Sequence, residues 1–116
     1  MTQEQKELLL RDLCARLSSM VRVKVDDEYM EGIYVLRGYE SGLFVVEGNH
    51  YDIDEVTPYL RLLGSMTEGE KNELLQLMGH GTDIERIDFY ISHHFDYRGL
   101  IEKGLALEAP EDMYKN

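Results

Sequence analysis

The feature that most constrains this fold is the spacing of apolar residues, which changes twice along the chain. Near the N-terminus, Leu10, Leu13 and Leu17 recur every three or four residues, which is the period of one face of an α-helix. Over residues 21–25 the period falls to two, as in a half-buried strand, and it returns to the helical value in the last third of the chain. Because 116 residues are enough for about one domain, we predict a single α+β domain over residues 1–116.

The first helix is predicted over residues 3–18. The run from Thr2 to Gln5 fits the capping-box pattern, in which two side chains satisfy free backbone N–H groups at a helix start. Cys14 lies beside the apolar stripe, and we expect this only cysteine to be a small core residue with no disulfide partner. The polar residues that we expect to lie largely in water are Lys6, Arg11, Asp12 and Arg16.

Residues 20–63 are predicted to form about five short strands. Turn-forming residues separate the apolar runs at residues 26–28, 40–42 and 48–49. Pro58 is expected to break the pattern before the last strand, because proline removes a hydrogen-bond donor from the ladder. Short strands with tight turns favour a small, bent antiparallel sheet, and an SH3-like barrel is the preferred form. An open meander packed against helices is the alternative.

Residues 67–108 return to helical spacing and are predicted to hold two to three helices. Thr67 and Thr82 each begin a capping box, and glycines at residues 79–81 end the first of these helices. The second is expected over about residues 83–95. The apolar residues of the two helices, expected to face inward, are Leu74, Leu75, Leu77, Met78, Ile84, Ile87, Ile91 and Phe95.

The end of the chain is predicted to be less regular. Leu100, Ile101, Leu105 and Leu107 indicate either a short final helix or an extended segment packed on the core. The tail over residues 109–116 has little in its sequence that would order it.

Net charge and hydropathy narrow the classes of partner. The chain has 12 Lys and Arg residues against 23 Asp and Glu residues, which gives a formal net charge of −11. Direct binding to nucleic acid needs clustered cations and is therefore not expected. The N-terminus is polar and acidic, unlike a signal peptide, and no apolar run approaches the length of a membrane span. We expect a cytoplasmic protein.

Three segments carry a resemblance to a known family. They are Leu8–Leu17, Pro58–Arg61 and Phe95–Pro110. They are similar to a family of small acidic proteins predicted in gut bacterial genomes and their phages or mobile elements, and the similarity extends over nearly the whole chain. The resemblance implies a cytoplasmic accessory role on a mobile element. It carries over no activity, ligand or catalytic residue.

The residues most typical of a catalytic or metal-binding site are His93 and His94. Imidazoles are common ligands of zinc and iron, so one hypothesis is a metal-dependent enzyme that uses this region. Adjacent residues on a helix point about 100° apart, however, and a metal would need a third ligand from elsewhere, such as His50 or His80. The structural interpretation, in which one His caps or packs the helix end, is preferred. No cofactor-binding motif or catalytic set is predicted.

The strand-forming segment is rich in tyrosine, which combines apolar area with a polar tip and is enriched at protein interfaces. A non-enzymatic module that binds another protein is therefore the preferred function, while the oligomeric state is left open. An acidic mimic of nucleic acid that inhibits a DNA-binding protein is a second hypothesis. The residues of the predicted interaction surface are Tyr29, Tyr34, Tyr39, Tyr51 and Tyr59.

Overall fold

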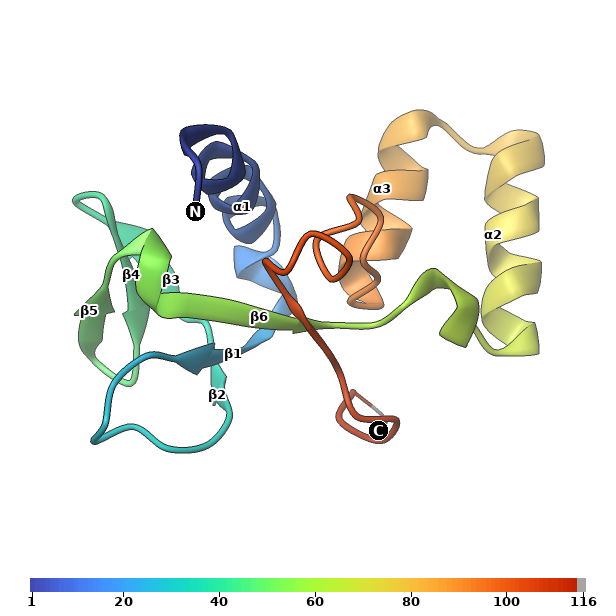
Figure 1. Ribbon diagram of the computed structural model, residues 1–116. Helices are drawn as coiled ribbons and strands as arrows, with labels where there is room; N and C mark the ends of the chain where they lie inside the picture. The colour runs from blue at the N-terminus through green and yellow to red at the C-terminus, as the bar shows by residue number, and fades with distance from the viewer. Residues whose placement is uncertain (115–116) are drawn as a thin grey trace.

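The computed structural model describes residues 1–114 and shows an α+β fold with an N-terminal helix, two small sheets and two later helices (Figure 1). This confirms the predicted class and the order of helix, strands and helices. The helical elements are α1 (Gln3–Ala15), α2 (Glu68–His80), α3 (Asp83–Ser92) and the short 3-10 turns η1 (Leu17–Ser19), η2 (Ile53–Glu55) and η3 (Leu63–Ser65). The strands are β1 (Arg22–Val25), β2 (Tyr34–Val35), β3 (Gly38–Glu40), β4 (Leu43–Val46), β5 (Asn49–Tyr51), β6 (Val56–Leu60) and β7 (Leu107–Glu108).

The strands form two sheets, and the described residues do not close them into a barrel. One sheet has the order β2-β1-β6-β7, with β6 and β7 parallel and the other pairs antiparallel. The second is an antiparallel meander of β3, β4 and β5. The turns predicted at residues 26–28 and 40–42 leave a single strand between them, but the structure splits it, because Leu36 donates its backbone N–H to Val21 whereas Arg37 donates to Val45. The chain therefore passes from one sheet to the other between these two residues.

Pro58 lies inside β6, although the sequence predicts a break there. The Asp26 N–H donates to the Glu55 carbonyl at 2.7 Å, and Pro58 lies opposite Val23 three residues along the ladder. Hydrogen-bonded and non-hydrogen-bonded pairs alternate in an antiparallel ladder, so this register puts Pro58 at a non-hydrogen-bonded position. Since β7 pairs only with Tyr59 and the residue after it, the missing donor disrupts neither neighbour.

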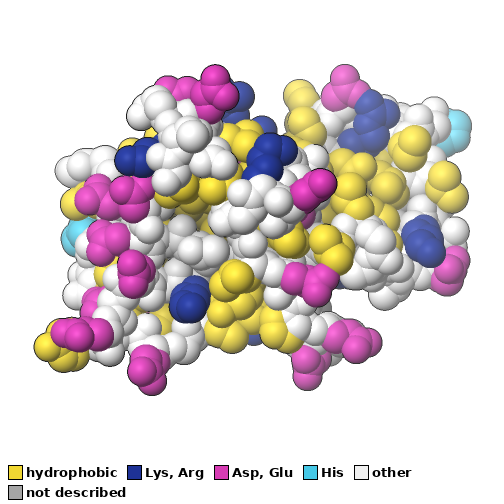
Figure 2. Space-filling model, viewed as in Figure 1, with side chains coloured by type: hydrophobic (Ala, Val, Ile, Leu, Met, Phe, Trp, Pro, Cys, Tyr) yellow, Lys and Arg dark blue, Asp and Glu magenta, His cyan; other side chains and the backbone are white. Residues whose placement is uncertain are grey.

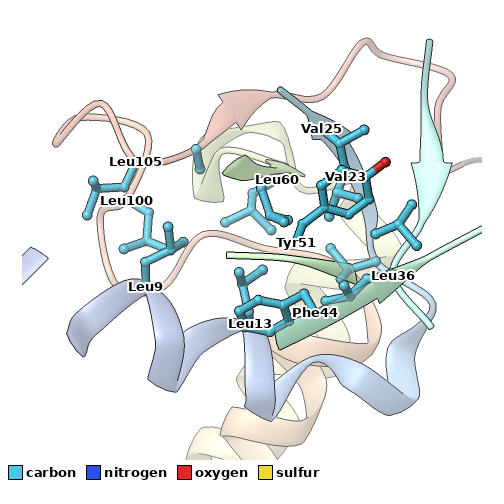
Figure 3. Close-up of a cluster of buried hydrophobic side chains, with 14 residues drawn as sticks. Leu9, Leu13, Val23, Val25, Leu36, Phe44, Tyr51, Leu60, Leu100 and Leu105 are labelled. Atoms are coloured by element: carbon cyan, nitrogen blue, oxygen red, sulfur yellow. The ribbon is translucent and has the colours of Figure 1, made fainter. Parts of the chain in front are cut away.

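The hydrophobic core lies between α1 and the two sheets. Leu9 and Leu13 point from α1 toward the strands, and they belong to the same cluster as Phe44, Leu60 and Val23 (Figure 3). All five side chains are at most 1% exposed. The β-segment, which is residues 20–63, is too small to bury its own apolar faces, so α1 completes its core.

Three predictions about α1 are wrong. Cys14 is exposed rather than part of the core. Asp12 and Arg16, expected in water, are both 0% exposed. The reason is that the buried face of α1 follows Leu9, Asp12 and Leu13, so a carboxylate takes a core position and Cys14 is turned outward.

The C-terminal part after α3 is extended and looped, so the second of its two predicted forms is the one observed. Gly99 and Gly104 adopt left-handed backbone angles of φ 75° and φ 76°, which a continuous helix cannot contain. Leu107 begins β7 beside β6. Residues 109–114 pack on the fold: Met113 is 7% exposed and the Tyr114 hydroxyl donates to the Tyr59 carbonyl at 2.7 Å. The last part of the predicted tail, residues 115–116, lies outside the described residues.

Candidate functional site

The most unusual part of the molecule is the α2–α3 hairpin, which projects away from the sheets (Figure 1). None of the 13 residues of α2, all of which the structure describes, is buried. In α3 only Phe89 is buried. The prediction that the apolar stripe of α2 faces inward is therefore wrong for Leu75 and Met78, whereas Leu74 and Leu77 are half-buried. Both helices leave large apolar side chains in water.

Four of these apolar side chains are strongly exposed, and we call them the hairpin residues. They are Leu75 at 64%, Met78 at 60%, Ile84 at 72% and Ile87 at 42% exposed. Figure 2 shows hydrophobic side chains gathered over the two helices on the face toward the viewer. Single exposed apolar residues are ordinary, but several on one small hairpin are typical of an interaction surface.

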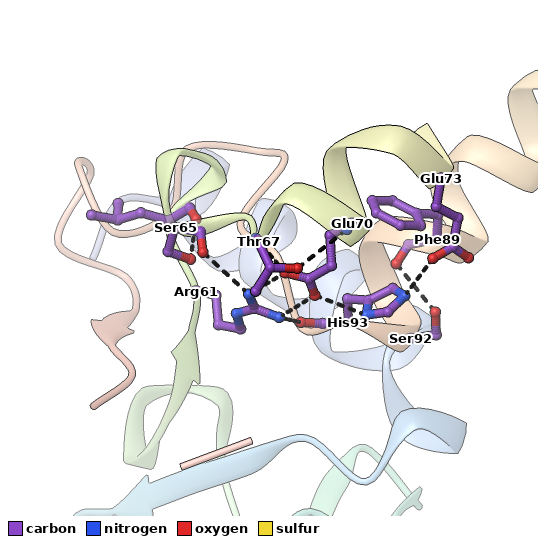
Figure 4. A network of polar contacts seen from close by, with 9 residues as sticks. Arg61, Ser65, Thr67, Glu70, Glu73, Phe89, Ser92 and His93 are labelled. Carbon is purple, nitrogen blue, oxygen red and sulfur yellow. Dashed lines mark hydrogen bonds and ion pairs between the residues drawn. The ribbon is translucent and has the colours of Figure 1, made fainter. Parts of the chain in front are cut away.

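A polar network fixes the hairpin to the end of β6 (Figure 4). The Arg61 guanidinium donates from Nη1 to Glu70 Oε2 at 2.8 Å and from Nη2 to Glu70 Oε1 at 2.7 Å. His93, at the end of α3, lies on the same carboxylate, with 3.1 Å between Nδ1 and Glu70 Oε2. Its Nε2 is 3.5 Å from Glu73 Oε2. One strand and both helices therefore meet at Glu70.

The local sequence explains why Glu70 is so well placed. It is the third residue of α2 and closes the capping box that begins this helix, and its carboxylate also accepts a hydrogen bond from the backbone N–H of Thr67 at 2.9 Å. The hydrogen bonds from Arg61 lower the pKa of Glu70 to about 2, despite an opposing effect of burial. The carboxylate is thus ionised at any physiological pH, and it forms a permanent ion pair with Arg61.

A second polar cluster ties α1 to the segment that follows α3. Asp12 accepts Arg16 Nε at 2.7 Å on one oxygen and Arg98 Nε at 3.1 Å on the other. Arg16 also donates from Nη2 to the Phe95 carbonyl at 2.7 Å. The guanidinium groups of Arg16 and Arg98 both lie over the Tyr97 ring. These contacts fix the base of the hairpin on the core.

His94 occupies a strained position between the polar network around Glu70 and the polar cluster around Asp12. Its backbone is left-handed at φ 64°, which is unusual for a residue other than glycine, and its carbonyl accepts the Arg61 N–H at 2.8 Å. The His94 ring stacks on Tyr114 with 3.8 Å between ring centroids. Burial lowers the pKa of His94 to about 4 and raises that of Tyr114 to about 12, so both rings are neutral at pH 7. A cleft of about 660 Å³ opens beside them.

The two histidines therefore have different partners. His93 contacts two glutamates of α2, whereas His94 faces the C-terminal segment. Within residues 1–114, no group of three or more His, Cys, Asp or Glu side chains is arranged to hold a metal ion. The metal-site hypothesis thus gains no support from the way the chain folds around His93.

The structure distributes the five tyrosines of the predicted interaction surface over several environments. Tyr29 is 87% exposed in the loop before β2, and Tyr39 is 38% exposed and packs on Phe44. Tyr34 is half-buried and donates its hydroxyl to the Glu31 carbonyl. Tyr51 is 4% exposed and donates to Asp27, which places it in the core. Tyr59 is half-buried in β6.

The hairpin residues were missed because their spacing is that of an ordinary buried face. A signal was present, since the first turn of α2 contains only charged residues and glycine, and its apolar residues crowd the second half. A helix built in this way can rest one end on ion pairs while its apolar part remains free.

Comparisons with known proteins return no match: no protein-family model, no curated protein and no solved structure corresponds to this chain. Among the described residues, no helix combines the length and apolar character needed to cross a membrane.

Proposed function

We propose that this protein is a non-enzymatic binding module that docks on another protein through the hairpin residues Leu75, Met78, Ile84 and Ile87. The observation that carries the proposal is a helix, α2, none of whose side chains is fully buried, with Leu75 and Met78 more than half exposed. Most helical stability in proteins comes from packing an apolar face, and isolated helices of this length are only marginally stable. A partner would supply the packing that the chain itself leaves out.

Covering the hairpin residues with a partner would contribute a substantial favourable free energy to binding. Complete burial of one Leu, Ile or Met side chain stabilises by about 1.5–3 kcal/mol. Burying even half of the exposed surface of the four hairpin residues would offset about 2–4 kcal/mol of association entropy. The polar network around Glu70 and the polar cluster around Asp12 hold the hairpin in place before binding, so little further ordering is needed when a partner binds.

In this proposal the β-segment is a scaffold. An SH3-like origin for this segment stays part of the proposal, and it is supported by the long loop before β2, the 3-10 turn η2 and the return of β6 to pair with β1. The cytoplasmic location that the sequence predicts, and the accessory role on a mobile element that the resemblance implies, are kept as parts of the same proposal. Tyr29, in the exposed loop, is the natural alternative docking point.

The proposal is tested by capture from nuclease-treated host lysate with three purified proteins. These are the wild type, a hairpin variant with all four hairpin residues changed to serine, and a control variant, Tyr29→Ser with Ile33→Ser, which removes exposed apolar surface from the loop instead. Because these side chains are exposed, circular dichroism and melting temperature should change little.

We expect one protein to be retained at high salt by the wild type and the control and to be lost from the hairpin variant. Equal retention by all three proteins would overturn the proposal. Loss from the control alone would move the docking surface to the tyrosine-bearing loop. A DNA-binding protein released by salt from all three would favour the nucleic-acid mimic.

A further inference from the structure

We infer that α3 packs against a basic amphipathic helix of the partner protein, an inference that rests on the proposed function. The contact surface is the isoleucine face, defined as Ile84, Ile87 and Ile91. These residues are spaced by three and four, so they lie along one side of α3. Phe89, the buried residue of this helix, lies on the opposite side at 100° per residue, so α3 has an inward and an outward apolar side.

The shape of the isoleucine face suits a helix. It is a single row about two turns long, with Ile84 at 72% and Ile87 at 42% exposed and Ile91 half-buried. A narrow row at these spacings interdigitates with the ridges of a second helix, and the same spacing recurs where amphipathic helices dock. Isoleucine also has few side-chain rotamers to lose when it is buried.

The charge around the face specifies the sign of the partner. Asp83, Glu85 and Asp88 lie on α3, against the single cation Arg86, which contacts Asp83. Asp88 lies four residues after Ile84 and three before Ile91, so its carboxylate borders the apolar row. Lysine or arginine beside the partner's apolar residues would meet these carboxylates and speed association.

The same charges argue against a second copy of this chain as the occupant. Two isoleucine faces in contact would bring Asp83, Glu85 and Asp88 of each copy near those of the other. Both chains also carry a formal net charge of −11, which adds repulsion at longer range. A basic partner removes both penalties.

The probe is a synthetic peptide of about 18 residues, made of leucine and lysine in an amphipathic helical pattern. Two control peptides are a sequence with glutamate in place of lysine and a scramble of the leucine–lysine composition. Binding to the full chain is measured by fluorescence anisotropy, and backbone amide shifts in NMR spectra locate the contact. Variants are Ile84→Ser with Ile87→Ser, Asp83→Asn with Asp88→Asn, and a charge-matched control, Asp26→Asn with Glu28→Gln in the loop before β2.

We expect the leucine–lysine peptide to bind with shifts centred on α3, and the serine variant to weaken binding about tenfold or more. The Asp83→Asn, Asp88→Asn variant should weaken it and flatten its salt dependence, while the loop variant should do neither. Equal binding by all variants, or equal binding of the glutamate or scrambled peptide, would overturn the inference. If this assay fails while the hairpin variant still loses its captured protein, the partner is of another chemistry and the proposed function stands.

Discussion

The buried carboxylate of Asp12 provides a prediction that can be worked from the structure. Asp12→Asn keeps the shape of the side chain and removes its charge. Asp12 and Arg16 are both 0% exposed, and Asp12 also accepts a hydrogen bond from Arg98. After the substitution, the Arg16 guanidinium would keep its bond to the Phe95 carbonyl but would have no anion beside it.

The expected loss follows from this geometry. Removing one partner of a buried ion pair leaves an uncompensated buried charge, which costs about 3–5 kcal/mol. For a domain of this size, that corresponds to a fall in melting temperature on the order of 10 °C or more. The free energy of unfolding is measured by urea titration at pH 7, monitored by circular dichroism and fitted with a common slope.

A second variant separates charge burial from loss of shape. In Asp12→Leu with Arg16→Met both buried charges are absent, and replacing a buried pair by apolar residues is often nearly neutral. We therefore expect this double variant to be more stable than Asp12→Asn alone. A loss below about 1 kcal/mol for Asp12→Asn, similar to that of an exposed control such as Glu4→Gln, would refute the reasoning.

Three further predictions concern the core, the His94 stack and a turn. Leu13→Ala, at a side chain that is 0% exposed, should cost about 2–5 kcal/mol in urea unfolding; a cost near zero would contradict its core position. His94 has a folded pKa of about 4 against an ordinary 6.5, so the unfolded chain binds more protons between these values. The wild type should lose about 1–3 kcal/mol between pH 6.5 and pH 4 beyond what His94→Asn loses, and parallel pH profiles would contradict this. Gly104→Ala should cost about 1–2 kcal/mol through its backbone angle of φ 76° alone, because no atom lies within 4 Å of the added methyl; an unchanged melting temperature would count against that conformation.

The sequence predicts local structure well where backbone chemistry is local. Capping boxes at Thr2, Thr67 and Thr82 begin α1, α2 and α3, and each is present with both hydrogen bonds. The change of apolar period likewise locates the strands. These features depend on residues within one turn of one another, so a single sequence is enough to identify them.

Long-range features could not be read in the same way. The spacing of Leu75 and Met78 matches a buried face, and only the course of the chain after residue 92 decides that no segment within residues 1–114 covers them. Asp12 is polar and therefore predicted in water, but partners at Arg16 and Arg98 make its burial possible. Pro58 depends on a register set by a strand more than thirty residues away. Each of these outcomes depends on which distant segments meet.

The docking site was the feature hardest to predict from the sequence, because a docking face and a core face have the same local pattern of apolar residues. Tyr51 shows the converse, since it was predicted to lie at an interface but is part of the core. Its hydroxyl donates a hydrogen bond to Asp27, and its ring packs in the hydrophobic cluster. What separates the two kinds of apolar face is the packing around them, which the sequence of this chain alone does not specify.

The most direct test of the account is amide hydrogen exchange along the chain, measured free and in complex with the protein captured at high salt. Because no side chain of α2 is fully buried, its amides should be among the faster-exchanging helical amides in the free chain. The account predicts that those of Glu68–His80 and Asp83–Ser92 gain protection in the complex, while the loop over residues 26–33 changes little. Protection confined to that loop, with the α2–α3 hairpin unchanged, would contradict it.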